Sequence, residues 1–256
     1  MRPRLLIFVI ALAVALGQDK PARLTFEVAS IKLSTTGGPG GGMKIMPGGV
    51  DWRAENFPLR PMISRMYLTP TRQVTGGPSW VDSDLWDIRA KADRPHNRDE
   101  MSEMFRNLLT DEFKLKLRKE VKEGPVYFLR VEKTGHKMKV NTSPDDFEIP
   151  FQGGPGGITV AKRATVERIC WELGLRLQGD ERPVIDATGL AGYYDFTLSF
   201  LPTLPPGFNI DSLPEAMRDR PNLFDAVRQQ LGLRLEPGKG PVTSYVIDQV
   251  EKPSAN

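Results

Sequence analysis

The residues best able to do chemistry are few in this chain of 256 residues, and they are widely spaced. The two histidines are His96, beside Pro95 in an expected loop, and His136, in a polar stretch. Neither has a second histidine four residues away or a cysteine nearby, as the common zinc sites require. The sequence therefore predicts no metal site and no cofactor.

Nucleophilic side chains are equally isolated. No Gly-x-Ser-x-Gly elbow occurs, and Ser64 and Ser102 fall within expected helices. Cys170 is the only cysteine, so no intramolecular disulfide can form. It lies on the apolar stripe of an expected helix, which favours a small buried hydrophobe over a nucleophile. We name no catalytic residue, and the binding residues stay unknown at this level.

Two pairs of acids and two glycine clusters are the remaining candidates for functional residues. The acids are Asp82 with Asp84, and Asp145 with Asp146. They would serve a glycosidase only if two carboxylates faced each other across a cleft. The glycine clusters at 37–42 and 153–157 lack the Lys-Ser or Lys-Thr that completes a phosphate-binding loop, so we interpret them as turns.

An internal repeat organises the elements that would position these residues. Residues 47–50, Pro-Gly-Gly-Val, recur as Pro-Gly-Gly-Ile at 155–158. Each is followed by an apolar stripe at helical spacing, from Leu59 to Met66 and from Val166 to Leu173. Proline is tolerated only in a first helical turn, so the first of these helices is expected to begin close to Pro58.

Paired strands are expected after each of these helices. They fall in 75–88 and in 184–198, where glycines would supply the turns of hairpins. Each repeat ends in a strand, a turn and a strand, with Gly124-Pro125 and Gly240-Pro241 at the turns.

A second helix is expected in each repeat, between the paired strands and the final strands. The first runs from Met101 to Phe113, and Asn97 with Glu100 can form a capping box at its start. The second runs from Leu223 to Leu231 and is entered through Pro221.

One pentapeptide, Leu-Gly-Leu-Arg-Leu, occurs twice in the chain. It occupies residues 173–177 and residues 231–235. In both places we expect the glycine to cap a helix just before a strand starts.

These elements define an α+β fold made of a tandem duplication of a β-α-β-β-α-β-β module. Its mixed or antiparallel sheets would each pack on two helices. The predicted boundaries are a signal peptide at 1–17, a first repeat at 18–140 and a second at 141–256. A polar linker is expected at 134–157 and a proline-rich insertion at 201–221.

The first seventeen residues have the pattern of a secretory signal peptide. Arg2 and Arg4 precede an apolar run from Leu5 to Leu16, and small residues follow. The run is shorter than the roughly 20 residues of a permanent span, so we expect cleavage and no permanent membrane span afterwards. The expected location is periplasmic or secreted.

The charge of the mature chain argues against a nucleic-acid partner. Without Arg2 and Arg4, 33 basic residues stand against 32 acidic ones. Only short basic runs remain, such as Lys114 to Lys122, which alternates with Leu115 and Leu117 and is interpreted as a solvated strand face. The expected partner is another envelope protein or an extracellular ligand.

Aromatic residues gather in the first repeat, where Trp52, Trp80 and Trp86 lie near Tyr67 in sequence. Such residues are most often core, and we predict that role for them. The alternative is an exposed surface for docking or sugar stacking.

The assembled motifs resemble a family of exported proteins expanded in soil acidobacteria, the domain of unknown function 3738. The resemblance covers nearly the whole mature chain. The resemblance rests on residues 26–32, 47–49, 76–80, 87–91, 125–127, 186–190, 230–233 and 246–248. No catalytic residues are established for that family. Relatives appended to membrane metallopeptidases of the β-lactam-sensor type imply sensing or interaction in the envelope, and a weaker fold-level likeness to the docking domains of secretins implies protein binding.

The function predicted from the sequence is a non-enzymatic extracytoplasmic interaction or sensing module of unknown specificity, with an exposed apolar groove. The alternative is an extracytoplasmic hydrolase that uses loop carboxylates on glycans or peptides. Two carboxyl groups about 5 to 10 Å apart in a shared cleft would favour that alternative.

Overall fold

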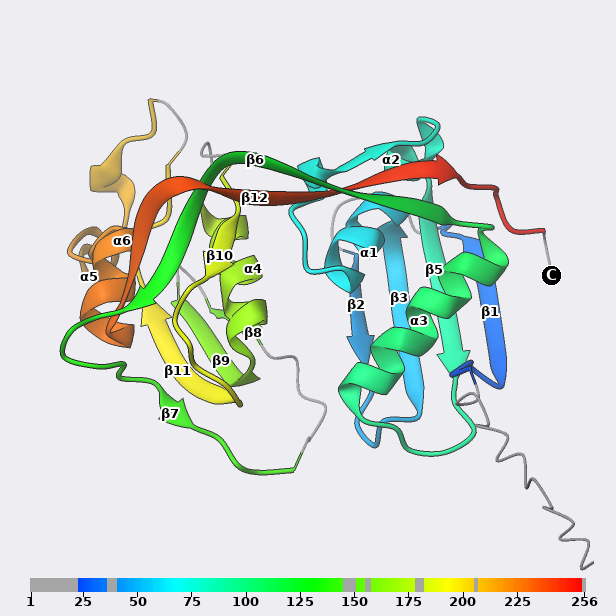
Figure 1. Cartoon of the computed structure of the whole chain (residues 1–256), viewed down its shortest axis with the longest axis horizontal. Helices are drawn as coiled ribbons and strands as arrows, with labels where there is room; N and C mark the ends of the chain where they lie inside the picture. The colour runs from blue at the N-terminus through cyan, green and yellow to red at the C-terminus, as the bar shows by residue number, and fades with distance from the viewer. Residues whose placement is uncertain are drawn as a thin grey trace, which may run out of the picture.

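The computed structural model describes residues 23–35, 41–144, 151–154, 158–177, 182–204 and 207–254. The predicted signal peptide and the acid pair Asp145 and Asp146 lie outside the described residues. Within these ranges, no helix is long and apolar enough to cross a membrane. The chain forms two lobes joined by a long two-stranded ribbon (Figure 1).

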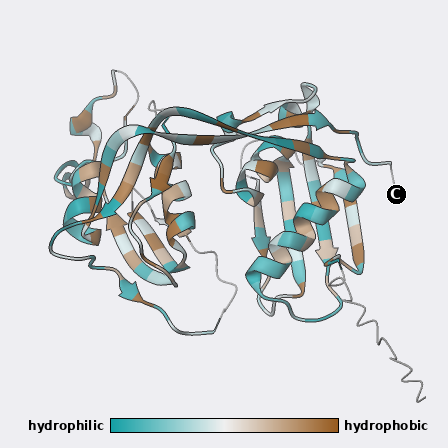
Figure 2. Ribbon diagram, in the orientation of Figure 1, coloured by the Kyte–Doolittle hydropathy of each residue, from teal (hydrophilic) through white to brown (hydrophobic). Residues whose placement is uncertain are grey.

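The first lobe is a four-stranded antiparallel sheet with helices on one face (Figure 1). Its strands, in spatial order, are β1 (Val28–Leu33), β5 (Leu85–Lys91), β3 (Asp51–Pro58) and β2 (Gly42–Ile45). Its helices are α1 (Leu59–Met66), the short α2 (Trp80–Ser83) and α3 (Arg98–Glu112), with a 3-10 turn η1 (Thr71–Gln73). The outward face of α3 is largely hydrophilic, because its apolar residues face the sheet (Figure 2).

The helix boundaries of this lobe follow local chemistry. Pro58 is the N-cap of α1, as predicted. Asn97 and Glu100 form the predicted capping box of α3: the Asn97 side chain accepts from the Glu100 backbone N–H, and the Glu100 side chain accepts from the Asn97 N–H. Two otherwise unpaired donors of the first turn are satisfied in this way.

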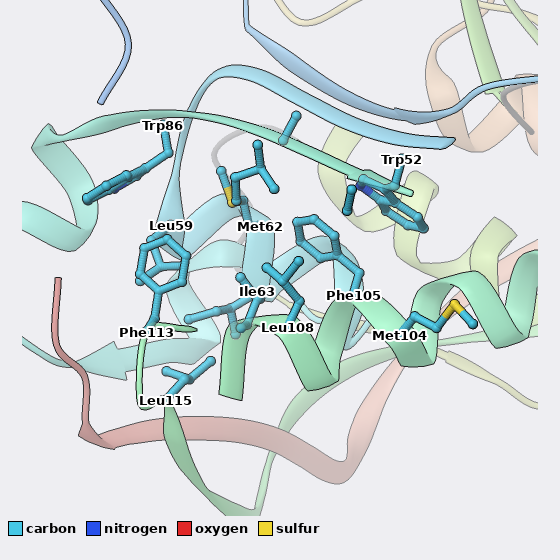
Figure 3. Close-up of a cluster of buried hydrophobic side chains, with 14 of the residues drawn as sticks. Trp52, Leu59, Met62, Ile63, Trp86, Met104, Phe105, Leu108, Phe113 and Leu115 are labelled. Carbon is cyan, nitrogen blue, oxygen red and sulfur yellow. The ribbon is translucent and has the colours of Figure 1, made fainter. Parts of the chain in front are cut away.

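The aromatic core of the first lobe lies between its sheet and α3 (Figure 3). Trp52 stacks on Phe105 with ring centroids 4.8 Å apart, and Trp86 meets Phe113 edge to face at 5.1 Å. Trp52 and Trp86 are buried, which confirms the core prediction for both, while Trp80 is half-buried.

The second lobe has the same sheet layout. Its strands, in spatial order, are β7 (Lys139–Val140), β11 (Tyr194–Ser199), β9 (Ile158–Ala164) and β8 (Phe151–Gly154). Its helices are α4 (Val166–Arg176) and α6 (Leu223–Ala226), and α6 continues into a π-helical turn, η3 (Val227–Leu231). The predicted insertion contains a 3-10 turn, η2 (Ile210–Ser212), and α5 (Glu215–Arg218). The predicted α+β class with antiparallel and mixed sheets is confirmed.

The ribbon consists of β6 (Lys116–Val131) and β12 (Leu233–Gln249), which pair antiparallel along nearly their whole length. The predicted turns at Gly124-Pro125 and Gly240-Pro241 are wrong, since both dipeptides lie inside these continuous strands, with Gly124 opposite Gly240. Proline is tolerated there because no third strand is paired with this stretch in the described residues, so its missing N–H leaves no ladder bond unmade.

The two predicted hairpins are also wrong. β4 (Val74–Gly76) runs parallel to β12 at Tyr245–Ile247 and is not paired with β5. β10 (Val184–Asp186) runs parallel to β6 at Tyr127–Leu129 and is not paired with β11. The open edges of the long ribbon carry unpaired backbone groups, and these short strands satisfy them.

The ribbon carries residues of both cores. Ile247, near the end of β12, is buried in the core of the first lobe. Tyr127 and Leu129 of β6 are buried in the core of the second lobe. Each half of the chain therefore contributes to the lobe of the other half.

The same irregularity occurs in both four-stranded sheets. Asn56 in β3 and Arg163 in β9 have positive φ angles of 50° and 48°, each at a bulge against the neighbouring strand. In each case an aspartate holds the displaced backbone: the Asn56 N–H donates to Asp87 and the Arg163 N–H to Asp195, both at 2.8 Å. Such bulges aim side chains and increase the twist of the strand.

The two copies of Leu-Gly-Leu-Arg-Leu differ in structure. Gly232 is the predicted helix cap, in the left-handed conformation at φ 63°. The prediction is wrong for Gly174, which lies inside α4, since that helix continues to Arg176.

Candidate functional site

The candidate site is a cleft between the lobes, where α1 and α3 of the first lobe face α4 of the second (Figure 1). Three adjoining cavities form it. The aromatic cavity, of about 180 Å³, contains Trp52 and Trp171 in its walls. The helix-end cavity, of about 450 Å³, lies at the N-termini of α3 and α4. The tyrosine cavity, of about 440 Å³, is lined by Tyr67 and Tyr245.

Four arginines from three helices reach this interlobe cleft. Arg65 lies in the last turn of α1, and Arg168 lies in the first turn of α4. Arg98 and Arg106 lie eight residues apart on α3, with Ser102 between them, so the three share one helix face. The helices of both lobes therefore direct cations into one space.

Arg168 is the central cation, because it lines all three cavities. Burial lowers the pKa of its guanidinium, and the nearby charge of Arg98 lowers that pKa further. Among the described residues, no carboxylate lies within 4.0 Å of this guanidinium, although Asp99, Glu172 and Glu167 partly offset its charge. Arginine keeps its proton in proteins, so Arg168 is a desolvated positive charge with no ion-pair partner.

The position of two arginines opposes the dipoles of their helices. Arg98 is the first residue of α3, and Arg168 is the third residue of α4. The N-terminal end of a helix carries partial positive charge, which disfavours a cation there. Both helix ends meet in the helix-end cavity, so their dipoles add to the positive potential of the arginines.

Arg65 is held by aromatic rings rather than by an acid. Its guanidinium lies 5.1 Å from the centre of the Phe57 ring and 6.0 Å from that of Trp171. Burial lowers the pKa of Arg65, and Glu172 partly opposes this. Glu172 itself is ion-paired with Arg176, so its charge is shared.

The tyrosine cavity adds hydroxyl donors. The rings of Tyr67 and Tyr245 lie 4.7 Å apart, and burial raises the pKa of both hydroxyls. Both therefore stay protonated at neutral pH. Arg106 is oriented beside them by a 3.2 Å hydrogen bond to the carbonyl of Met66.

Cations outnumber acids in the walls of the cleft. The cationic residues are Lys44, Arg65, Arg98, Arg106, Arg163 and Arg168. The acidic residues are Asp99, Glu167 and Glu172. Arginine forks, tyrosine hydroxyls and helix N-termini are groups that bind carboxylate and phosphate oxygens, so the cleft has the chemistry of an anion site.

Most of the candidate side chains from the sequence lie outside the interlobe cleft. Asp82 is paired with Arg60, and Asp84 with Lys252. Cys170 is buried in the second core, as predicted, and burial raises its pKa.

Of the two serines named as nucleophilic side chains, Ser102 lines the cleft, where its hydroxyl donates to the carbonyl of Arg98. The buried Ser64 hydroxyl donates to the carbonyl of Thr69.

Sequence reasoning missed the arginines, because an isolated arginine is most often a solvated surface residue. The spacing of Arg98, Ser102 and Arg106 could have indicated a polar helix face. Nothing local indicated that Arg65 and Arg168, more than a hundred positions apart, would lie in one cleft. The aromatic cavity is one candidate for the expected apolar groove, although its walls also carry charge.

His96 lies between two carboxylates and outside the cleft. Its Nε2 is 2.9 Å from Asp93 Oδ1, and its Nδ1 is 3.1 Å from Glu100 Oε2. The contact with His96 is the main cause of the lowered pKa of Asp93. For Glu100, the backbone N–H of Asn97 is the main cause of the lowered pKa, and His96 adds to it.

These lowered pKa values predict how stability depends on pH. The carboxylates stabilise the fold above their unfolded pKa values of about 4, and that contribution is lost as the pH falls through the folded values. Asp93→Asn should therefore show a smaller loss of unfolding free energy than the unaltered protein between about pH 5 and pH 3. Urea denaturation at several pH values measures this. An identical pH dependence in both proteins would contradict the assignment.

The fold and the cleft define a two-lobed α+β protein with a cationic site between its lobes. The profile of a family described as a protein of unknown function, DUF3738, matches residues 60–250, and the chain belongs to that family. No curated protein and no solved structure matches the chain.

Proposed function

We propose that this protein is an extracytoplasmic binding or sensing module whose interlobe cleft receives an anionic ligand. The observation that carries the proposal is Arg168, a desolvated cation without an ion-pair partner among the described residues, at the meeting point of three cavities. A ligand anion would offset both its desolvation and its repulsion by Arg98.

The proposal is supported by placements of charge that reduce the stability of the fold. Cations at the N-terminal ends of two helices, like charges close together and a half-buried guanidinium each oppose folding. Such conflicts between local preference and structure are expected at functional sites. The extracytoplasmic location rests on the signal-like pattern of residues 1–17.

The two lobes are copies of one module joined in tandem, each copy ending in a single long strand, and the cleft lies where the copies meet. Several features support this. The strand order β1-β5-β3-β2 corresponds to β7-β11-β9-β8, and each sheet has an aspartate that holds a positive-φ bulge. β4 and β10 add to opposite ends of the ribbon in the same parallel sense.

The substitution Arg168→Met tests the binding function. In the unaltered protein, at least one of acetate, benzoate, citrate, sulfate and phosphate should raise the melting temperature in a saturable manner. Arg168→Met should weaken that binding at least about tenfold, because the central guanidinium is lost. Without ligand, the variant should melt at the same temperature or about 2–4 °C higher, since a half-buried charge without an ion-pair partner among the described residues is removed.

The matched control is Arg228→Met, which removes an arginine of η3 that lies outside the cleft and is paired with Asp225. It should leave anion binding unchanged and corrects for the general stabilising effect of sulfate and phosphate. Equal responses of Arg168→Met and the unaltered protein to every anion would exclude this function.

A further inference from the structure

The aromatic cavity differs from the rest of the cleft, because it combines cations with apolar walls. Arg65 and Arg168 supply guanidinium groups, while Trp171, Phe151 and Leu175 supply apolar surface. The helix-end cavity is larger and is lined mostly by polar and charged residues. The two parts of the cleft therefore suit different parts of a ligand, or different ligands.

Trp52 is a buried aromatic residue in the wall of this cavity. Its side chain is 4% exposed, it lines the cavity, and its indole N–H has no hydrogen-bond acceptor among the described residues. Buried indole N–H groups usually find an acceptor. The stacking contact with Phe105 holds the ring in place, so the donor cannot easily reach water.

From these features we infer that the aromatic cavity binds a small monocarboxylate with an aromatic or branched aliphatic body. The inference rests on the proposed anion-binding function and names the ligand class. The carboxylate would bind Arg65 and Arg168, whose planar forks match its geometry. The body would lie against Trp171, Phe151 and Leu175.

The balance of charge and surface favours a carboxylate over a phosphate. Glu172 lines the same cavity, and its negative charge opposes a second negative charge on the ligand. The apolar walls disfavour the strongly hydrated phosphate group, because its hydration shell would have to be removed without enough donors to replace it. A monoanion with an apolar body meets both conditions.

Isothermal titration calorimetry of the purified protein tests this inference with five probes. Benzoate and 3-methylbutanoate should bind. Benzamide, which has the same shape as benzoate without the charge, should bind at least about tenfold more weakly. Acetate, which lacks the apolar body, and inorganic phosphate should also bind at least about tenfold more weakly than benzoate.

Two tryptophan variants separate the role of the cavity wall from general effects on the core. Trp52→Phe keeps an aromatic ring and removes part of the cavity wall, and it should weaken benzoate binding about five- to tenfold. The matched control is Trp86→Phe. The Trp86 N–H is equally buried and equally without an acceptor among the described residues, but Trp86 does not line the cavity, so benzoate binding should be unchanged.

The possible results distinguish the two proposals. If acetate or phosphate binds in an Arg168-dependent manner as well as or better than benzoate, the ligand class inferred here is overturned while the anion-binding function stands. If benzamide matches benzoate, or Trp52→Phe binds benzoate as well as Trp86→Phe does, this inference is again overturned. If no anion binds in an Arg168-dependent manner, both proposals fail.

Discussion

Residues 18–140 and residues 141–256, produced as separate polypeptides, should each fail to fold cooperatively. When mixed, they should form a folded one-to-one complex. The reason is the ribbon: β6 belongs to the first fragment and β12 to the second, and they pair from Val131 opposite Leu233 to Lys116 opposite Gln249. Neither fragment contains both strands, so each would expose a long unpaired edge.

The cores lead to the same expectation. The first fragment would lack Ile247, which closes its core, and would expose Tyr127 and Leu129, which belong to the other core. Exposed apolar surface on both fragments removes a large part of the stabilisation, and net stability is only about 5–15 kcal/mol. Circular dichroism with urea titration, and size-exclusion chromatography of the mixture, measure the outcome. A cooperative urea transition in either fragment alone would contradict this prediction.

Gly232→Ala should be among the most destabilising single substitutions in the chain, with a loss of more than about 3 kcal/mol of unfolding free energy. Gly232 has a φ of +63°, which an alanine adopts only with strain. A Cβ at this position would also lie 2.4 Å from the carbonyl oxygen of Gly135. That neighbouring segment is held in place, because the Glu132 N–H donates to the Gly232 carbonyl and the Lys137 N–H donates to the Leu231 carbonyl.

Two other glycines are matched controls for this substitution. Gly189 has a φ of +70°, but a Cβ there meets nothing within 4 Å, so Gly189→Ala should lose only about 1–2 kcal/mol. Gly174 is helical with open space around it, so Gly174→Ala should gain about 0.5–1 kcal/mol. Urea denaturation of the three variants compares them directly. A loss for Gly232→Ala no larger than that for Gly189→Ala would show that the close approach of Gly135 is unimportant.

The helices and their ends were predictable because the physics behind them is local. Within a helix a proline fits only the first turn, so α1 had to begin near Pro58, and Asn97 with Glu100 satisfies the first-turn donors of α3 from three residues away. The apolar spacing of Val166 to Leu173 likewise predicted α4. These signals depend only on neighbouring residues, so they hold whatever the tertiary arrangement.

Strand partners were not predictable in the same way. Glycines after β4 and β10 are compatible with a hairpin, and the sequence offers no sign that a strand more than fifty residues away competes for the same edge. A Gly-Pro pair has the composition of a turn, yet it fits the middle of a strand wherever the proline nitrogen faces no partner. The cleft depends on these pairings, because the ribbon sets how α1, α3 and α4 face one another.

The repeated pentapeptide Leu-Gly-Leu-Arg-Leu shows most clearly the difference between what the local sequence determines and what tertiary contacts determine. By itself, the sequence determined the α+β class, the amphipathic helices and their caps, since these follow from periodicity and short-range hydrogen bonding. Only the tertiary structure decided that Gly174 continues a helix whereas Gly232 ends one, because Gly135 packs against the second glycine and β12 begins beside β6. Likewise, only the tertiary structure brought Arg65, Arg98 and Arg168 together, since the electrostatic field of a cleft arises from charges that are distant in sequence and close in space.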